Sequence, residues 1–363
     1  MSDTVIVRSN LIIYDPRVGK IARSLKKRYP VTVLGWNREG ISAELIKSYA
    51  IPLKLFNLKA PAGKPSLVAY LPLFWIWIFF KLVIYRPQVV YACDFDTIFP
   101  CYLYKIILRK KLVFDIIDRY AMTHIPQKFT ILYMLVNLFE EIFGTKADMF
   151  VTVSEKLLST FKRKSKQCAI IMNCSEYRPK NEIKSRDNIL TLVYTGAVAK
   201  MRGLERIAEA IKGLDGVEFV VAGKVLDQDL LEQILRLSNI KYKGLFQQAE
   251  SIDLEASCDV MICLYDLRIP NFNFALPVKT FEAMMLGLPV ITNVGFELID
   301  EVDCGIKVEY DDLNQIKSAI VRLRDDQELR RRLGTNGRKA FEQKYNWDNS
   351  EQELYKMYDK LLR

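Results

Sequence analysis

Residues 271–292 read NFNFALPVKTFEAMMLGLPVIT and contain a loop, a helix, a tight turn and a buried strand in succession. Pro277 suits the first turn of the helix, and Gly287 ends it directly before Pro289. Because this helix follows a strand expected over 260–264, its free N–H groups favour a bound diphosphate at the carboxyl edge of a sheet. Glu282 lies about one and a half turns into the helix. Its carboxylate could accept hydrogen bonds from a ribose, although a solvated glutamate fits the same position.

Short β-rich runs alternate with helical patterns along the chain, which is typical of α/β folds with parallel sheets. In the first half we expect strands over 4–8, 31–34, 89–92, 112–115 and 149–153, with helices such as 18–27 and 130–143 between them. The pattern restarts with strands over 190–195, 218–222, 260–264 and 289–292. The sequence therefore predicts two successive doubly wound units.

A polar stretch that contains Pro179 and many charges separates these units and is typical of a linker. We expect an N-terminal Rossmann-like domain over 1–173, the linker over 174–187, and a C-terminal Rossmann-like domain over 188–345. A final segment over 346–363 carries a helix at 349–362 past the second unit.

The net charge of +10 is unevenly distributed. Residues 1–180 hold 28 Lys and Arg against 13 Asp and Glu, whereas the remaining residues hold 25 against 30. This asymmetry predicts an anionic partner for the first half, such as lipid headgroups, a phosphorylated substrate or nucleic acid. No basic-aromatic RNA motif or recognition-helix module is evident, so nucleic acid is not the expected partner.

The seven cysteines form no CxxC pair and show no metal-like spacing, which indicates reduced thiols in a cytosolic protein. No signal peptide is expected, because the chain enters an apolar strand at Thr4-Val5-Ile6-Val7. His124 is the only histidine, which argues against a His-based metal site and against a catalytic triad. We expect neither a metal nor another cofactor.

One segment is unusually apolar: residues 66–80 carry no charge, and residues 71–80 read LPLFWIWIFF. The segment has about 15 residues before Lys81, whereas a membrane-spanning helix needs roughly 20. Two interpretations stay open, a buried helix between strands and an interfacial helix with Trp75 and Trp77 at headgroup depth. Lys81 would then contact the headgroups, as would three flanking cations: Lys59, Lys64 and Arg86.

The pattern P-x-K-x-x-E-x-M-x-x-G-x-P-V-I at 277–291 resembles the donor-site signature of GT-B glycosyltransferases of family 4, the glycosyl transferases group 1. Further similarities follow in order along the chain: Asp15-Pro-Arg17-Val, 33–38, Tyr91-Ala-Cys-Asp94-Phe-Asp96, 151–155, Tyr194-Thr-Gly196, Arg202-Gly203-Leu, Gly223, Gly244 and Asp259-Val. The resemblance implies an α/β GT-B fold. Two Rossmann-like doubly wound parallel-sheet domains would face a cleft, and a C-terminal helix would cross back to the first domain.

The resemblance also implies that the second domain binds a sugar nucleotide. Gly196 would open a loop on which Lys200 and Arg202 grip the diphosphate, since cations there stabilise the charge of the leaving group. Lys279 and the N–H groups after Pro277 would line the phosphates. Glu282 would hold the ribose.

The first domain would bind the acceptor. Five residues are expected on its side of the cleft: Asp15, Arg17, Asp94, Asp96 and Arg119. The catalytic residue is unassigned, with Asp94, Asp118 and His124 as candidates. Asp94-Phe-Asp96 also has the D-x-D form that binds metal in GT-A enzymes, but two doubly wound units do not suit the single-domain GT-A fold.

Three positions depart from the family pattern. Phe274 stands where a second glutamate often contacts the donor sugar, Ala197 where an arginine follows the glycine, and Ile117 where a histidine is common. These departures leave the sugar unassigned.

The resemblance implies a hexosyltransferase of polysaccharide or glycoconjugate biosynthesis. It would move a sugar from a UDP- or GDP-sugar to a lipid-linked or glycan acceptor, without metal and with retention of configuration. The basic first half and the apolar segment suggest a peripheral protein at the cytoplasmic face of the cell membrane. A non-catalytic GT-B-like membrane scaffold and a sugar-nucleotide epimerase remain alternatives.

Overall fold

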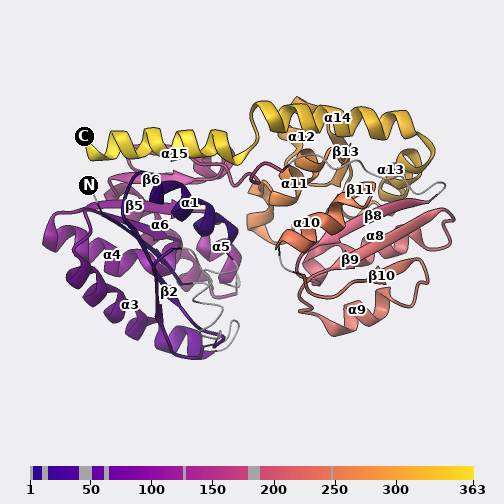
Figure 1. Cartoon of the computed structure of the whole chain (residues 1–363). Helices are drawn as coiled ribbons and strands as arrows, with labels where there is room; N and C mark the ends of the chain where they lie inside the picture. The colour runs from indigo at the N-terminus through magenta and orange to yellow at the C-terminus, as the bar shows by residue number, and fades with distance from the viewer. Residues whose placement is uncertain are drawn as a thin grey trace. The chain divides into compact units, whose positions relative to one another are not determined.

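The computed structural model describes residues 3–9, 15–40, 51–60, 65–125, 128–178, 189–246 and 248–363. The chain divides into two compact units, shown in Figure 1: unit 1 is Met1–Asn173 with Ser350–Arg363, and unit 2 is Cys174–Asn349. Lys64, Pro179 and most of the expected linker lie outside the described residues.

Unit 1 contains a parallel sheet of seven strands in the order β3-β2-β1-β4-β5-β6-β7. The strands are β1 (Thr4–Arg8), β2 (Val31–Trp36), β3 (Leu53–Phe56), β4 (Val89–Cys93), β5 (Lys111–Ile116), β6 (Met149–Thr152) and β7 (Cys168–Ile170). The strand order reverses between β1 and β4, which are neighbours in the sheet with Ile6 opposite Tyr91. A crevice opens at the carboxyl ends of the strands where such a sheet reverses.

The helices of unit 1 cover the two faces of this sheet. They are α1 (Pro16–Lys26), α3 (Pro65–Tyr85), α4 (Phe95–Leu108), α5 (Tyr120–His124), α6 (Thr130–Lys146) and α7 (Glu155–Ser159). Buried residues of α3 and α4, such as Phe74 and Ile98, share one core with Val5 and Val7 of the central strand β1. The connections between parallel strands are right-handed, so the helices after β1 and after β4 cover opposite faces.

Helix α3 contains the apolar segment and continues through Lys81 to Tyr85. Phe74, Ile78 and Leu82 are fully buried, which gives the helix one packed side. The other side is exposed, so neither the buried nor the interfacial interpretation describes the whole helix. Among the described helices, none is long and apolar enough to cross a membrane.

Helix α15 (Trp347–Leu362) passes from the end of unit 2 into unit 1. Within unit 1 it packs on the end of α1, next to which it runs in Figure 1. The Tyr355 hydroxyl donates to the Ser24 carbonyl at 2.9 Å, and the Tyr358 ring lies 5.4 Å from the Tyr29 ring. The C-terminal helix is therefore an integral part of the first unit.

Unit 2 contains a second parallel sheet, with six strands in the order β10-β9-β8-β11-β12-β13. The strands are β8 (Leu190–Thr195), β9 (Val217–Ala222), β10 (Ile240–Tyr242), β11 (Val260–Cys263), β12 (Val290–Thr292) and β13 (Gly305–Lys307). The helices are α8 (Leu204–Ile211), α9 (Gln228–Ile234), α10 (Gln248–Ala256), α11 (Val278–Leu286), α12 (Phe296–Val302), α13 (Leu313–Asp325) and α14 (Gln327–Gln343). The order reverses between β8 and β11. The prediction of two doubly wound parallel-sheet units is confirmed.

Candidate functional site

The candidate donor site lies in unit 2, where the strand order reverses between β8 and β11. The loop after β8 contains a short 3-10 turn, Lys200–Arg202, and the loop after β11 leads to the N-terminus of α11. The Asp266 N–H donates to the Met201 carbonyl at 3.1 Å, so the two loops touch. Sheets of this kind bind ligands at such a point.

Helix α11 begins after Pro277, which has an extended backbone and provides no side-chain cap. The first N–H groups of a helix have no partner inside the helix. Gly287 ends the helix in the left-handed region, with φ of 70°, as the sequence predicts. Gly334 of α14 packs directly on this turn, because a Cβ there would lie 2.0 Å from the Gly287 carbonyl oxygen. This contact holds the C-terminal end of α11 directly against α14.

Lys279, on the first turn of α11, binds two buried carboxylates. Its Nζ lies 2.7 Å from Glu255 Oε1 and 2.6 Å from Glu282 Oε2. Thr195, the last residue of β8, donates its hydroxyl to the same Glu255 oxygen. The Glu255 side chain is fully buried, and that of Glu282 is 5% exposed. This ion-pair cluster, formed by Glu255, Lys279 and Glu282, joins the end of β8 to the start of α11.

The charges of this cluster depend on one another. Burial, reinforced by the negative charge of Glu282, raises the pKa of Glu255 to about 7. Burial lowers the pKa of Lys279, but the two carboxylates outweigh it and hold that pKa above its usual range. Lys279 is therefore a cation at neutral pH, while Glu255 titrates near neutrality.

Arg202 comes from the other loop and lies over aromatic rings. Its guanidinium carbon is 4.6 Å from the centroid of Tyr265 and 5.2 Å from that of Phe272. Burial raises the pKa of Cys263, the last residue of β11, to about 11, and the positive charges of Arg202 and Lys279 oppose this rise. Both cations are therefore close enough to the end of β11 to affect that thiol. Lys200 is different: its side chain is 74% exposed, and its Nζ lies 3.8 Å from Asp227 Oδ2.

Two glycines allow the loop after β8 to lie against the end of β9. Gly196 has φ of 153° and Gly223 has φ of 134°. A Cβ at Gly223 would lie 1.9 Å from the Gly196 carbonyl oxygen, so the two backbones are in direct contact. Only glycine fits at Gly223. This contact is the physical reason for a glycine at a position that the sequence analysis noted only as a similarity to the family.

In unit 1, the strand order reverses between β1 and β4, and charged residues from both strand ends meet there. Arg8 donates through Nε to Asp15 Oδ2 at 2.8 Å and through Nη1 to Asp94 Oδ2. Ser9 donates to Asp96 Oδ2. Asp94 has φ of 64° and ψ of 167°, a backbone region that strongly favours glycine, so its placement costs about 1–3 kcal/mol. This acceptor-side cluster, formed by Arg8, Ser9, Asp15, Asp94 and Asp96, is a second candidate site.

Two other residues expected on the acceptor side are inside the unit. Arg17 is 1% exposed and forms a two-pronged ion pair with Asp115, at 3.0 and 2.8 Å. Arg119 is 3% exposed, lies 3.1 Å from Glu140 Oε2 and covers the ring of Phe161. Such buried pairs hold elements together: Arg17 connects α1 to β5, and Arg119, directly before α5, connects the start of that helix to α6.

Asp118 and His124 lie near the acceptor-side cluster but are exposed. The His124 ring is 4.6 Å from the Tyr120 ring. Partial removal from water lowers the pKa of His124 despite the negative charges of Asp96 and Asp118. The imidazole is therefore neutral at pH 7.

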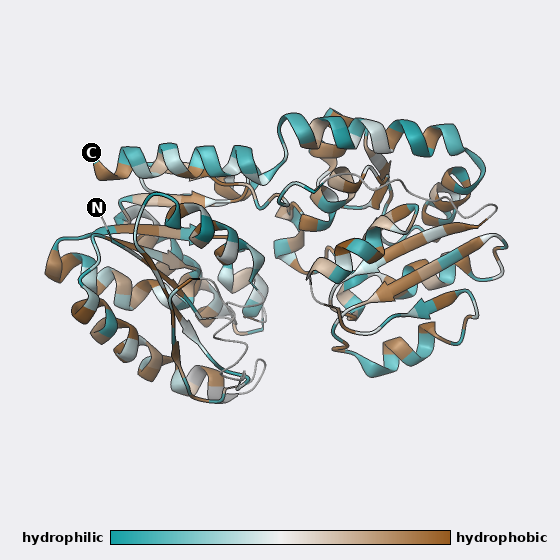
Figure 2. Ribbon diagram, viewed as in Figure 1, coloured by the Kyte–Doolittle hydropathy of each residue, from teal (hydrophilic) through white to brown (hydrophobic). Residues whose placement is uncertain are grey.

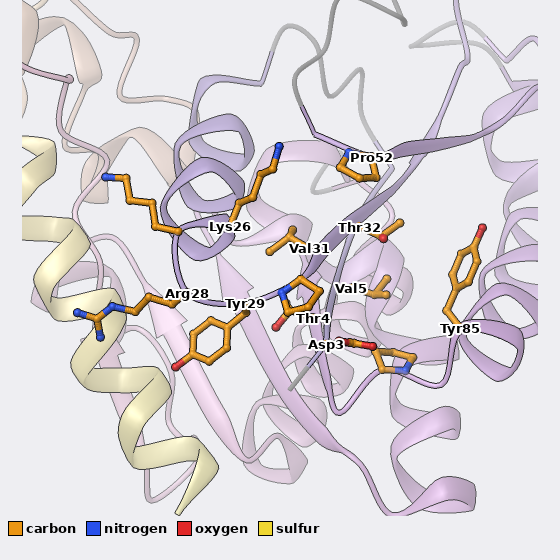
Figure 3. Close-up of a pocket in the computed structure, with 13 residues that line it drawn as sticks. Asp3, Thr4, Val5, Lys26, Arg28, Tyr29, Val31, Thr32, Pro52 and Tyr85 are labelled. Carbon is orange, nitrogen blue, oxygen red and sulfur yellow. The ribbon is translucent and has the colours of Figure 1, made fainter. Parts of the chain in front are cut away.

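A cavity of about 580 Å³ lies at the opposite edge of the unit 1 sheet, at the amino ends of β1 and β2 (Figure 3). Two of its basic residues contact α15: Lys27 Nζ lies 2.7 Å from Glu351 Oε1, and Arg28 covers the Tyr355 ring. This cavity is separate from the acceptor-side cluster, which lies at the carboxyl edge.

The family comparison falls on unit 2. Residues 190–326, from β8 to the end of α13, match the family model described as glycosyl transferases group 1. The match includes Gly196, Lys200, Arg202 and the whole ion-pair cluster. Most of unit 2 is therefore similar to a group 1 glycosyl transferase domain.

Two curated proteins have similar sequences. An uncharacterized glycosyltransferase of Methanocaldococcus jannaschii is 27% identical over 173 residues, which cover 47% of this chain and 48% of that protein. The capsular polysaccharide biosynthesis glycosyltransferase CapM of Staphylococcus aureus is 27% identical over 176 residues, 47% of this chain and 46% of its own. The chain thus spans about half the length of the curated relatives it matches.

A solved structure matches the whole chain. Anabaena HepE in complex with UDP-glucose aligns with a TM-score of 0.77 and 15% identity, over 99% of this chain and 100% of the other. This likeness shows the fold, so the predicted GT-B fold class is confirmed.

Sequence reasoning missed several residues that the structure brings to these sites. Glu255 lies in a helix with four other polar or charged residues, and nothing in that pattern marks it as buried. Asn293 was also missed, although its side chain binds both the N–H and the carbonyl of Tyr265 at 2.8 Å. In unit 1, the sequence did contain a signal for Arg8 and Ser9. These residues lie at the carboxyl end of β1, just as Asp94 lies at the carboxyl end of β4.

Proposed function

We propose that the protein is a glycosyltransferase that moves a sugar from a UDP- or GDP-sugar to a lipid-linked or glycan acceptor. The observation that carries the proposal is that the family match and the candidate donor site coincide in unit 2. Fold alone does not decide this, because other sugar-nucleotide chemistry uses similar folds. The structure of Anabaena HepE contains UDP-glucose, and CapM is named for capsular polysaccharide biosynthesis, which supports a nucleotide-sugar donor and a glycan product.

In this proposal the donor binds where β8 and β11 end. The N–H groups at the start of α11, with Lys279 and Arg202, hold the diphosphate, since both fixed dipoles and cations favour anions. Glu282 accepts hydrogen bonds from the ribose. Lys200, which is highly exposed, can move from Asp227 to the phosphates when the donor arrives. These cations stabilise the charge that the nucleotide gains as it leaves, without a metal.

We propose transfer with retention of configuration. The buried carboxylates of the donor site, Glu255 and Glu282, are both held by Lys279, so neither is positioned as a free nucleophile. Attack from the face of the departing nucleotide, with a donor phosphate oxygen accepting the proton, then requires no enzyme nucleophile. The acceptor binds to unit 1, where Asp94 and Asp96 orient its hydroxyl. His124, neutral at pH 7, is a further acceptor-side candidate.

The exposed side of α3 supports an acceptor that resides in a membrane, with the protein held peripherally at the cytoplasmic face. Lys81 stays a candidate for headgroup contact. Trp75 and Trp77 are only partly exposed, because the Trp75 Nε1 donates to the Asp96 carbonyl at 2.6 Å and the Trp77 ring packs on Phe56 and Phe74.

The test of the donor site is a thermal-shift panel of UDP, GDP, ADP, CMP and their common sugar conjugates. A nucleotide at about 100 times its dissociation constant stabilises the folded state by about 2.7 kcal/mol and raises Tm by about 5–10 °C. We expect Glu282→Ala to lose this shift and Glu309→Ala, an exposed glutamate of the same unit, to keep it. No shift with any nucleotide, from a well-folded protein, would favour the scaffold instead.

Transfer itself is tested with the nucleotide sugar that binds and a polyprenyl-phosphate-linked glycan. We expect Asp94→Asn to retain the thermal shift while product formation falls at least about 100-fold, the usual contribution of a well-placed acid or base. Release of an altered sugar nucleotide in the absence of acceptor would identify an epimerase and contradict the proposal.

A further inference from the structure

Exposed hydrophobic side chains are concentrated on three helices of unit 1. The described residues include twenty large hydrophobic side chains that are exposed, and fourteen lie on α3, α4 and α6 or directly before α6. These fourteen are Leu73, Ile76, Phe80, Ile84, Phe99, Ile106, Ile107, Phe129, Ile131, Leu132, Met134, Leu135, Leu138 and Phe139. Single exposed apolar residues need no explanation, but such a concentration marks an interaction surface.

On α3 the exposed residues form a helical stripe. Leu73, Ile76, Phe80 and Ile84 recur every three or four residues, and their side chains are 49–67% exposed. The opposite stripe packs on the sheet. Both sides of this helix are therefore apolar, and its ribbon is brown over much of its length in Figure 2.

The three helices form one continuous layer. The Trp75 ring of α3 lies 5.2 Å from the Phe99 ring of α4, and the Tyr102 ring of α4 lies 5.4 Å from the Phe143 ring of α6. These contacts close the spaces between neighbouring helices. The outer surface of α3, α4 and α6, here called the three-helix face, is thus a single surface.

The charge of the three-helix face has one sign. Across the described residues 65–111 and 128–148, no aspartate or glutamate is exposed. The same residues include five exposed cations: Arg86, Arg109, Lys111, Lys128 and Lys146. Four of them follow or end one of the three helices, so they form a basic border at the amino edge of the sheet.

We propose that the three-helix face docks on an anionic lipid bilayer, its hydrophobic side chains entering the interfacial region and its basic border contacting lipid phosphates. An apolar surface bordered by cations and lacking exposed acids is complementary to such a bilayer. A second copy of the chain is a poorer occupant, since symmetric pairing would bring two basic borders together. The three helices would lie parallel to the bilayer surface, because one side of each helix is buried in unit 1 and only the other side is free to contact lipid.

The three-helix face includes α4 and α6 in addition to the α3 residues considered for headgroup contact. The docking proposal rests on the proposed function only for its purpose, which is access to a lipid-linked acceptor. Vesicle binding requires no nucleotide and no acceptor. Its failure would therefore leave the donor site untouched, and failure of nucleotide binding would leave this surface untouched.

The test is flotation of the full chain with vesicles of phosphatidylcholine alone and with 30% phosphatidylglycerol, without nucleotide. The face variant carries Ile76→Ser, Phe80→Ser and Ile131→Ser. Its matched control replaces three exposed leucines of unit 2, Leu226→Ser, Leu235→Ser and Leu245→Ser. We expect the face variant to lower the partition coefficient on anionic vesicles at least about tenfold, and the control to leave it unchanged.

A charge variant, Arg86→Gln with Arg109→Gln and Lys111→Gln, separates the two contributions. We expect it to reduce the preference for anionic over neutral vesicles at least about tenfold while retaining the fold, as judged by circular dichroism. Absence of flotation with anionic vesicles, or equal loss in the face variant and its control, would overturn the proposal. Self-association that the face variant abolishes, seen by sedimentation velocity without flotation, would assign the surface to a second copy instead.

Discussion

Lys279 Nζ lies 2.7 Å from Glu255 Oε1. This contact connects α11, where the sequence predicts site residues, with α10, where it predicts none. Lys279 is on the first turn of α11, and Glu255 is near the end of α10. A second carboxylate, that of Glu282, lies 2.6 Å away from the same ammonium. The cation on the first turn of α11 is therefore held by two buried anions.

Removing Lys279 is expected to destabilise the protein strongly. Lys279→Met leaves two buried carboxylates without their cation, which costs about 3–5 kcal/mol. The matched control is Lys241→Met, because Lys241 Nζ also lies 2.7 Å from a carboxylate but is 44% exposed, where a pair contributes about 0–1 kcal/mol. Urea denaturation measures both. Equal losses in the free energy of unfolding of the two variants would contradict the prediction, because they would show that burial does not increase the contribution of the ion-pair cluster to stability.

Glu255 is expected to make stability depend on pH. Its pKa is about 7 in the fold and near 4.5 in the unfolded chain, so the unfolded chain loses its proton first. Its contribution to stability is complete below pH 4.5 and declines as the pH rises to 7. Glutamine cannot ionise, so Glu255→Gln should lose less stability than wild type between pH 5 and pH 8. Parallel stability profiles, from denaturation across this range, would contradict the assignment.

Donor affinity is expected to follow the same titration. Above pH 7, ionised Glu255 competes with Glu282 for Lys279 and adds negative charge close to the proposed diphosphate site. Nucleotide affinity, measured by calorimetry, should therefore fall as the pH rises through about 7 in wild type. Glu255→Gln should remove this fall. A variant that merely loosened the fold would weaken binding at every pH.

Gly223 is expected to tolerate no side chain. A Cβ at this position would lie 1.9 Å from the Gly196 carbonyl oxygen, so Gly223→Ala must move the loop that presents Arg202. Gly213→Ala is the control: its φ is 66°, and a Cβ would meet nothing within 4 Å. The control should lose about 1–2 kcal/mol from backbone strain alone and keep nucleotide binding. Intact nucleotide binding by Gly223→Ala would show that the glycine contact does not position the loop.

Arg17 is expected to act through stability rather than through the acceptor. Arg17→Lys keeps the charge but cannot form both bonds to Asp115, which leaves a buried acceptor unpaired at a cost of about 1–3 kcal/mol. Nucleotide binding by unit 2 should be unchanged. The free energy of unfolding and the acceptor KM distinguish the roles, since a direct acceptor contact would raise KM without a change in stability.

The strands that sequence reasoning found and those that it missed differ in position. The inner strands, such as β1 and β8, are buried along their whole length and consist mainly of apolar and β-branched residues. The four missed strands are β3, β7, β10 and β13, and each is at an edge of its sheet. They have three or four residues and are partly exposed, so any apolar run or alternation in them is too short to distinguish them from a loop.

The apolar segment shows a similar limit. Its composition predicts a helix with a hydrophobic role but cannot tell which side chains face outward. The structure turns Phe74, Ile78 and Leu82 onto the sheet and exposes Ile76 and Phe80. A helix that is apolar all round gives no periodic signal, so only the neighbouring strands decide its orientation.

The sequence by itself determined the α/β class, the repetition of a doubly wound unit, and the helix that begins after Pro277 and ends at Gly287. These features follow from local patterns of apolar, glycine and proline residues, which act on the backbone within a few positions. Only the tertiary structure decided which charges meet: Lys279 with Glu255, Arg8 with Asp94, and Arg17 with Asp115. The members of these pairs are 24 to 98 residues apart, and their contacts depend on strand order, which no local pattern contains.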